Sequence, residues 1–171
     1  MKKTLSLIIM ALMALSLAVL SACKKEGGGN GEEVSGKYVD LGLSSGAKWK
    51  AVNEENAADV EYAFTYDEAI AAYGNKLPSR EQWEELVNEC SWSWTGMGYK
   101  VVGPSGKSIS LPAEGRRYCS GGATFEGSGG YYWSSTPHGS DRAWYLYFHS
   151  GGVYMDYYYR GYGYAVRLVQ D

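Results

Sequence analysis

The order of apolar and polar residues divides the chain into an apolar leader, a glycine-rich stretch and a longer region of short repeating patterns. Leu5–Leu20 is almost continuously apolar and follows the basic residues Lys2 and Lys3. Glu26–Gly36 reads EGGGNGEEVSG and shows no apolar period. From Lys37 onward, apolar residues recur at helix or strand spacing, so residues 37–171 predict one folded domain.

Two short helices are predicted in the first half of this domain. Thr65 and Glu68 have capping-box spacing and Gly74 suits a helix end, which predicts a helix over Tyr66–Tyr73. A second helix begins after the cap Ser79, and its apolar face carries Trp83, Leu86, Val87 and Cys90. Its solvent-facing positions are expected to hold Glu81, Glu84, Glu85 and Glu89.

Strands and turns fill the rest of the domain. Tyr38–Leu43 and Ala47–Val52 predict a hairpin closed by the turn at residues 44–46. Further strands are expected at Ser91–Thr95, Tyr99–Val102, Ser108–Leu111, Tyr131–Ser135, Ala143–His149, Val153–Tyr157 and Tyr164–Val169. The predicted fold class is α+β, with two helices packed on twisted antiparallel sheets and long loops.

The leader is expected to be an address rather than part of the fold. Its apolar run is shorter than the about 20 residues of a membrane span, and it ends in small residues. Leu20-Ser21-Ala22-Cys23 resembles a bacterial lipobox, which implies a signal peptide over residues 1–22 and lipid on Cys23. Residues 23–36 then form a flexible tether, and Lys24 favours sorting of the lipid-anchored protein to the outer membrane. We expect the domain at the cell surface, although the sequence leaves open whether it faces the periplasm or the exterior. An uncleaved anchor or a plain secretory signal is the alternative.

Charge and motifs exclude several classes of function. The 171 residues carry a net charge of −3 and the domain has no basic run, which argues against nucleic-acid binding. Residues 42–46 match G-x-S-x-G but precede a strand, and residues 103–108 lack the first glycine of a phosphate-binding loop. No zinc spacing surrounds the two histidines. We therefore predict no catalytic residue, metal or cofactor, and leave open whether Cys90 and Cys119 pair.

Several segments together resemble one bacterial family. They read YVDLGLSSG at 38–46, LPSREQWEEL at 77–86, YKVVGP at 99–104, ISLPA at 109–113, YWSS at 132–135 and AVRLV at 165–169. In this order they resemble the Fibrobacter succinogenes major paralogous domain, which is common in lipoproteins of gut Bacteroidetes. The resemblance implies a C-type-lectin-like fold over residues 37–171. LPSREQWEEL and AVRLV also resemble the formylglycine-generating-enzyme branch of that fold, whose copper-binding cysteine pair has no evident match here.

Tyrosines concentrate near the C-terminus, where ten of the 16 lie between Tyr131 and Tyr164. From Ala143 to Asp156 the pattern alternates, with Trp144, Leu146, Phe148, Val153 and Met155 on one face and mainly tyrosine on the other. Tyrosine with serine and glycine gives adaptable binding surfaces their contact area, so the second face predicts a ligand-binding surface. The alternative is a tyrosine-rich strand face buried against another sheet.

A compositional bias accompanies this pattern. Between His138 and Tyr164 there is no Lys, Glu, Gln or Asn. The second-face residues are types reachable from an asparagine codon by changing only its adenines. This resembles the variable region of a target protein of a diversity-generating retroelement. With Gly139 as a further variable position, the ligand-binding residues predicted are His138, Ser140, Asp141, Arg142, Tyr145, Tyr147, His149, Tyr154, Asp156, Tyr157, Tyr158, Tyr159, Tyr162 and Tyr164.

These observations predict a surface lipoprotein that binds a protein or glycan ligand and performs no chemistry. The membrane is expected to be contacted only through the lipid on Cys23. Two alternatives remain: a structural envelope or adhesion component whose tyrosines dock a fixed partner, and an enzyme related to the formylglycine-generating branch that uses Cys90 or Cys119 as a redox thiol.

Overall fold

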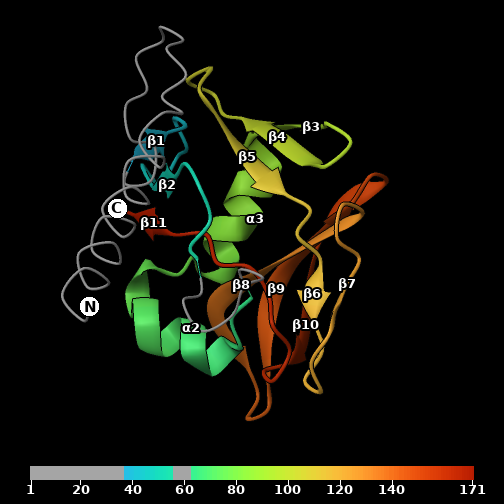
Figure 1. Cartoon of the computed structure of the whole chain (residues 1–171). Helices are drawn as coiled ribbons and strands as arrows, with labels where there is room; N and C mark the ends of the chain where they lie inside the picture. The colour runs from blue at the N-terminus through green and yellow to red at the C-terminus, as the bar shows by residue number, and fades with distance from the viewer. Residues whose placement is uncertain (1–36, 56–62) are drawn as a thin grey trace, which may run out of the picture. The chain divides into compact units, whose positions relative to one another are not determined.

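The computed structural model describes residues 37–55 and 63–171. The signal peptide expected at residues 1–22, the tether at 23–36 and the lipidation site Cys23 lie outside the described residues. The described part is an α+β domain, as predicted, with two α-helices, three three-stranded antiparallel sheets and one two-stranded sheet (Figure 1). None of its helices combines the length and the apolar character that a membrane crossing requires.

The elements follow one another with these bounds: β1 (Tyr38–Asp40), β2 (Lys48–Lys50), α2 (Tyr66–Tyr73), the 3-10 helix η2 (Gly74–Lys76), α3 (Arg80–Glu89), β3 (Ser91–Trp94), β4 (Gly98–Val102), β5 (Ser108–Pro112), β6 (Arg116–Arg117), β7 (Ala123–Thr124), β8 (Gly129–His138), β9 (Arg142–His149), β10 (Gly152–Tyr159) and β11 (Val169–Gln170). The strand orders are β1-β2-β11, β3-β4-β5, β8-β9-β10 and β6-β7.

Both helices begin at the predicted caps. The Glu68 amide donates to the Thr65 hydroxyl at 3.3 Å, and the Thr65 amide donates back to the Glu68 carboxylate at 2.8 Å. Ser79 and Gln82 make the same reciprocal pair before α3. Gly74 follows α2 with a φ of +51°, a left-handed conformation that glycine adopts without strain. Local capping therefore sets the first residue of each helix.

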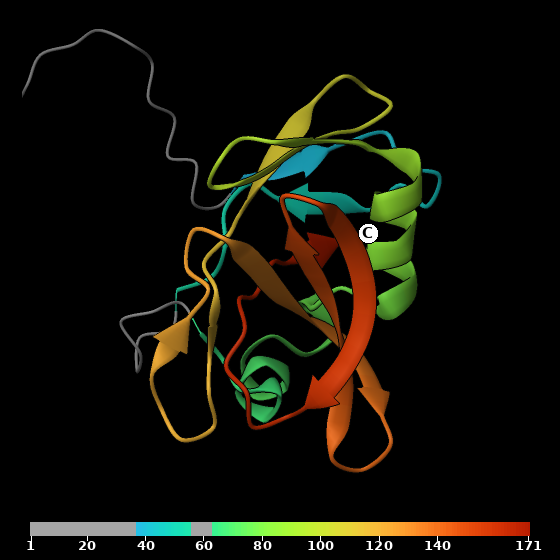
Figure 2. The same cartoon turned by 90° about the vertical axis from the view of Figure 1, so that its right-hand side faces the viewer.

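Helix α3 packs one face, with Trp83 and Leu86, against the main core, and Figure 2 shows this helix at one side of the domain. The Trp83 side chain is fully buried, its ring centroid lies 4.6 Å from that of Trp49, and its Nε1 donates to the Trp133 carbonyl at 3.3 Å. The apolar face predicted for this helix is therefore correct. Two of its acids are not simply solvent-facing, because Glu85 and Glu89 accept hydrogen bonds from the turn at residues 44–46.

The sheet of β8, β9 and β10 presents two distinct faces. β9 is central, and β10 pairs with β9 alone among the described strands, so β10 is an edge strand (Figure 2). Tyr154 of β10 lies opposite Tyr147 of β9, and Met155 opposite Leu146. Because side chains alternate across a strand, the first pair lies on one face and the second pair on the other. Leu146 and Met155 pack into the core that contains α3.

The C-terminal segment does not form the strand predicted at Tyr164–Val169. It packs instead into a second core, whose buried residues are Phe64, Tyr66, Ala69, Leu77, Tyr131, Trp133, Ala143, Tyr145, Tyr164, Val166 and Leu168. Only Val169–Gln170 is a strand, because the preceding residues bond to several neighbours in turn. Tyr164 exchanges two backbone hydrogen bonds with Phe64, and Ala165 donates to the Tyr131 carbonyl. Strands β6 and β7 were not predicted, since two residues are too short to show an alternating pattern.

Candidate functional site

One face of strands β9 and β10, together with Tyr162 just beyond β10, gathers six of the fourteen predicted binding residues. We call it the tyrosine face and define it as Tyr147, His149, Tyr154, Asp156, Tyr158 and Tyr162. Tyr154 is the most exposed of its tyrosines, with 48% of its surface accessible, and Tyr158 and Asp156 are also exposed. Tyr147, His149 and Tyr162 are half-buried. Large aromatic side chains held on a sheet surface give a rigid contact area.

Ring contacts order the side chains of the tyrosine face. The Tyr154 centroid lies 6.1 Å from that of Tyr147 and 5.8 Å from that of His149. At the other end of β10, the Tyr158 and Tyr162 centroids lie 4.8 Å apart. These contacts restrict the rotation of the rings, so little conformational entropy remains to be lost when a ligand binds.

Tyr145 and Tyr164 do not belong to an exposed surface, and this part of the prediction is wrong. Only 5% of the Tyr145 surface is accessible, and Tyr164 is fully buried. The Tyr164 centroid lies 4.2 Å from Trp133 and 4.8 Å from Tyr145. The same strand face that is open at β10 is covered at β8 and β9 by the C-terminal segment and α2, and alternation along one strand cannot reveal that cover.

The remaining predicted residues lie at the end of the sheet and largely on its opposite face. His138 stacks on Tyr157 with 3.7 Å between centroids, and Arg142 donates to the Tyr159 hydroxyl at 3.3 Å. Trp144, expected in the core, is only half-buried and lies under the Arg80 guanidinium at 3.9 Å. Gly139, Ser140 and Asp141 form the exposed turn between β8 and β9. The fourteen residues therefore form two separate surfaces and a buried pair.

A cation beside the tyrosine face was missed by the sequence interpretation. Arg116 of β6 has its guanidinium carbon 5.2 Å from the ring centroids of Tyr118 and Tyr131, 5.2 Å from Phe125 and 5.5 Å from Tyr162. Phe125 and Tyr118 are both exposed. The available sequence signal was the Arg-Arg pair at 116–117, which has no recognisable period.

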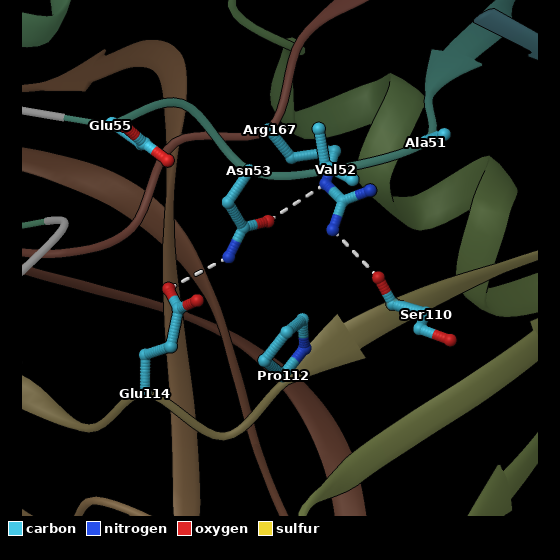
Figure 3. Close-up of a pocket in the computed structure, with 8 residues that line it drawn as sticks. All are labelled: Ala51, Val52, Asn53, Glu55, Ser110, Pro112, Glu114 and Arg167. Carbon is cyan, nitrogen blue, oxygen red and sulfur yellow. Dashed lines mark hydrogen bonds between the residues drawn. The ribbon is translucent and has the colours of Figure 1, made fainter. Parts of the chain in front are cut away.

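A cavity of about 410 Å³ lies away from the tyrosine face. It is lined by Ala51, Val52, Asn53, Glu55, Ser110, Pro112, Glu114 and Arg167 (Figure 3). Arg167 is almost completely buried and donates to the Asn53 side chain at 2.8 Å, the Lys50 carbonyl at 2.7 Å and the Ser110 carbonyl at 2.6 Å. Its nitrogen atoms are thus bonded to the protein, so Arg167 joins three segments of the domain.

Glu114 is one of the two carboxyl groups that line this cavity, and Glu55 supplies the other. The Asn53 amide donates to Glu114 at 2.7 Å and to the Tyr132 hydroxyl at 3.0 Å. Burial raises the pKa of Glu114 above its ordinary value, and this effect outweighs the opposing influence of Asn53 and Arg167. Because Asn53, Glu114 and Arg167 bond to one another or to the backbone, we interpret the cavity as structural.

The two cysteines of the domain are free. Cys90 is half-buried and Cys119 is exposed. Burial, with a smaller effect of Glu89, raises the pKa of the Cys90 thiol to about 11. A thiol with that pKa is protonated at neutral pH, so the geometry gives no support to Cys90 as a reactive thiolate. In the described ranges, no three His, Cys, Asp or Glu side chains come close enough together to hold a metal ion.

The described residues thus form an α+β domain with an exposed aromatic surface on an edge strand. Residues 94–169, from the end of β3 to the start of β11, match a family described as a domain of unknown function (DUF8237). No curated protein and no solved structure matches the chain significantly. The matched segment includes the whole tyrosine face and Arg116.

Proposed function

We propose that this protein is a lipoprotein, anchored in the outer membrane through Cys23, whose C-type-lectin-like domain binds a protein or glycan ligand at the cell surface. Binding involves the tyrosine face and no chemical reaction. Two helices beside several short antiparallel sheets are consistent with the proposed fold. The sequence of the leader supports the anchor.

The observation that carries the binding role is the exposure of Tyr154 and Tyr158 on the edge strand β10. Contiguous exposed aromatic surface on a folded domain marks a site of interaction. Tyrosine combines a large apolar ring with a hydroxyl group, and few rotatable bonds must be fixed when it binds. We propose further that the tyrosine face is diversified by a retroelement, because its residue types are those that adenine mutagenesis of asparagine codons produces.

Sequences from sibling strains test this proposal. If the face is diversified, differences between siblings concentrate at exposed positions such as Tyr154, Asp156 and Tyr158. The buried Tyr145 and Tyr164 then vary only with their packing partners, because changes there disrupt the second core. Differences spread evenly over the domain would contradict diversification.

Binding is tested separately with the full chain in detergent. Tyr154→Ser is compared with Lys107→Ser, a change at an exposed turn of another sheet. Selection from a random peptide library and from a panel of neutral and acidic oligosaccharides should give binders whose affinity falls about tenfold or more with Tyr154→Ser and stays unchanged with Lys107→Ser. Binders that are insensitive to Tyr154 and its neighbours on the tyrosine face would refute the proposed surface.

A further inference from the structure

The surroundings of Arg116 suggest a recognition site beside the tyrosine face. Its guanidinium lies among the rings of Tyr118, Phe125, Tyr131 and Tyr162, each 5.2–5.5 Å away. Its Nε is buried and makes no hydrogen bond within the described part of the chain. Within the described ranges Lys50, Arg80 and Arg160 each pair with a carboxylate, and Arg116 does not. Arg116 is therefore a cation held by aromatic rings without a carboxylate partner among the described residues.

Phe125 adopts a backbone conformation that supports a functional role for this cluster. Its φ is +66°, and it is the only described residue other than glycine with a positive φ. The Ser128 and Gly129 amides donate to the Phe125 carbonyl at 3.0 and 2.9 Å and hold the turn. A bulky residue is strained in this region, and such strain concentrates at binding sites. The turn places an exposed ring against Arg116.

We propose that Arg116 binds a carboxylate group of an acidic polypeptide ligand that lies along the tyrosine face. This inference rests on the proposed function and names the chemistry of the ligand. Arginine presents a planar pair of donors that matches a carboxylate, and desolvation by neighbouring rings strengthens that contact. A single guanidinium without a carboxylate partner among the described residues balances the one negative charge of a carboxylate better than the nearly two charges of a phosphate.

The arrangement of rings favours a polypeptide over a sugar. From the exposed Phe125 the rings continue through the buried Tyr131 and the half-buried Tyr147 to the exposed Tyr154, with centroid separations of 6.4, 4.9 and 6.1 Å. Such a row matches about five residues of extended chain, at about 3.3 Å each. The row ends at β10, whose outer edge has no partner strand among the described strands. Where a chain that follows the row reaches this edge, its backbone groups can bond to the free backbone groups of β10.

The test uses the full chain in detergent micelles and a random peptide library. Selection is run on the wild type, on Arg116→Gln and on Lys107→Gln, which removes a charge from an exposed turn elsewhere. We expect the wild type and Lys107→Gln to enrich peptides containing Asp or Glu, and Arg116→Gln to lose this enrichment. Absence of acidic enrichment on the wild type, or its persistence on Arg116→Gln, would overturn the proposal.

A matched peptide pair then measures the contact itself. In the tightest-binding acidic peptide, the required Glu is replaced by Gln. This change should weaken binding to the wild type about tenfold or more and leave binding to Arg116→Gln nearly unchanged. If both proteins lose affinity equally, the carboxylate contacts another residue and the assignment to Arg116 is wrong.

Two further measurements separate the possible failures. If Arg116→Gln does not fold, as judged by its thermal melt, the wild type alone is titrated with the peptide pair between about 0.05 M and about 0.5 M salt. The affinity of the acidic peptide should fall as the salt concentration rises, because salt screens an ion pair, and the affinity of the Gln peptide should not. Equal salt dependence of the two peptides would refute the contact. Sugars are tested in the same way. If 3′-sialyllactose binds through Arg116 while neither lactose nor any peptide binds, the ligand is not a polypeptide. Peptides that depend on Tyr154 but not on Arg116 leave the proposed function intact and overturn this inference.

Discussion

Tyr145 and Tyr154 lie on the same face of neighbouring strands, and replacing each by serine should have very different effects. Tyr145 has 5% of its surface exposed and contacts Trp133 and Tyr164, whereas Tyr154 has 48% exposed. We predict that Tyr145→Ser strongly destabilises the domain and that Tyr154→Ser hardly does. The comparison tests whether the second core, rather than the alternating pattern, decides which tyrosines are available to a ligand.

The magnitudes follow from burial. A buried tyrosine removes about 150–250 Å² from water, which at about 25 cal/mol per Å² gives an upper limit of about 4–6 kcal/mol. Large aromatic truncations in cores cost about 3–5 kcal/mol, so we expect about 4 kcal/mol for Tyr145→Ser. Tyr154 keeps about half of its surface in water, and its site can fill with water after truncation, so about 1 kcal/mol is expected.

Thermal and urea unfolding followed by circular dichroism provide the assay. A loss of about 4 kcal/mol corresponds to a fall in Tm of about 12–20 °C for a domain of this size, and about 1 kcal/mol to a fall of about 3–5 °C. Tyr145→Phe is the matched control, because it removes only the hydroxyl that donates to Asp156 at 3.4 Å. Similar melting temperatures for the two serine variants, or a cost below about 1 kcal/mol for Tyr145→Ser, would refute the reasoning.

The remaining predictions concern the main core, the cavity, the buried tyrosines and the anchor. Trp83→Ala should cost about 3–5 kcal/mol in a urea titration, because the side chain is fully buried, and a loss below about 1 kcal/mol would contradict its position in the core. The raised pKa of Glu114 means that folding favours its protonated form. Glu114→Gln should therefore raise the free energy of unfolding at neutral pH and leave it unchanged below the ordinary glutamate pKa of about 4.3. Urea titrations over a pH series that show the opposite trend would contradict this expectation. Burial raises the pKa of Tyr131 to about 12. The stability that the protonated Tyr131 contributes is therefore complete below the ordinary tyrosine pKa of about 10 and is lost as the pH rises through about 12. Near-ultraviolet absorbance should show Tyr131 ionising late, together with unfolding, and early ionisation of every tyrosine would argue against its burial. Cys23→Ser should release the mature protein from membranes or leave an unprocessed precursor, as detergent partitioning would show, and a mature variant that still partitions as an integral component would exclude the lipid anchor.

Short-range signals predicted most of the secondary structure. The capping boxes at Thr65 and Ser79 placed the starts of both helices correctly, because they depend on residues only three positions apart. The apolar spacing around Trp83 identified the buried face of α3. Strand β11 and the pair β6–β7 were misplaced or missed, since their hydrogen bonds join residues distant in sequence and their lengths are too short to show a period.

The sequence predicted that tyrosines form the candidate site, but not which of these tyrosines are exposed. Strand alternation correctly separated Tyr154 from Met155, whose side chains lie on opposite sides of β10. It could not show that the C-terminal segment covers Tyr145, because that cover comes from residues about twenty positions further along the chain. Nor could it bring Arg116 to the tyrosine face, since β6 reaches Tyr131 and Tyr162 only through tertiary packing.

Residues close together in the chain set the α+β class, the helix caps, the alternation along β9 and β10, and the concentration of tyrosine in those strands, so these features could be predicted from the sequence alone. Which tyrosines remain accessible, and which cation lies beside them, depends on how distant segments pack together. Burial is a property of the surroundings, and a strand face is exposed only where no other segment packs on it. For this reason Tyr154 is available to a ligand and Tyr145 belongs to the core.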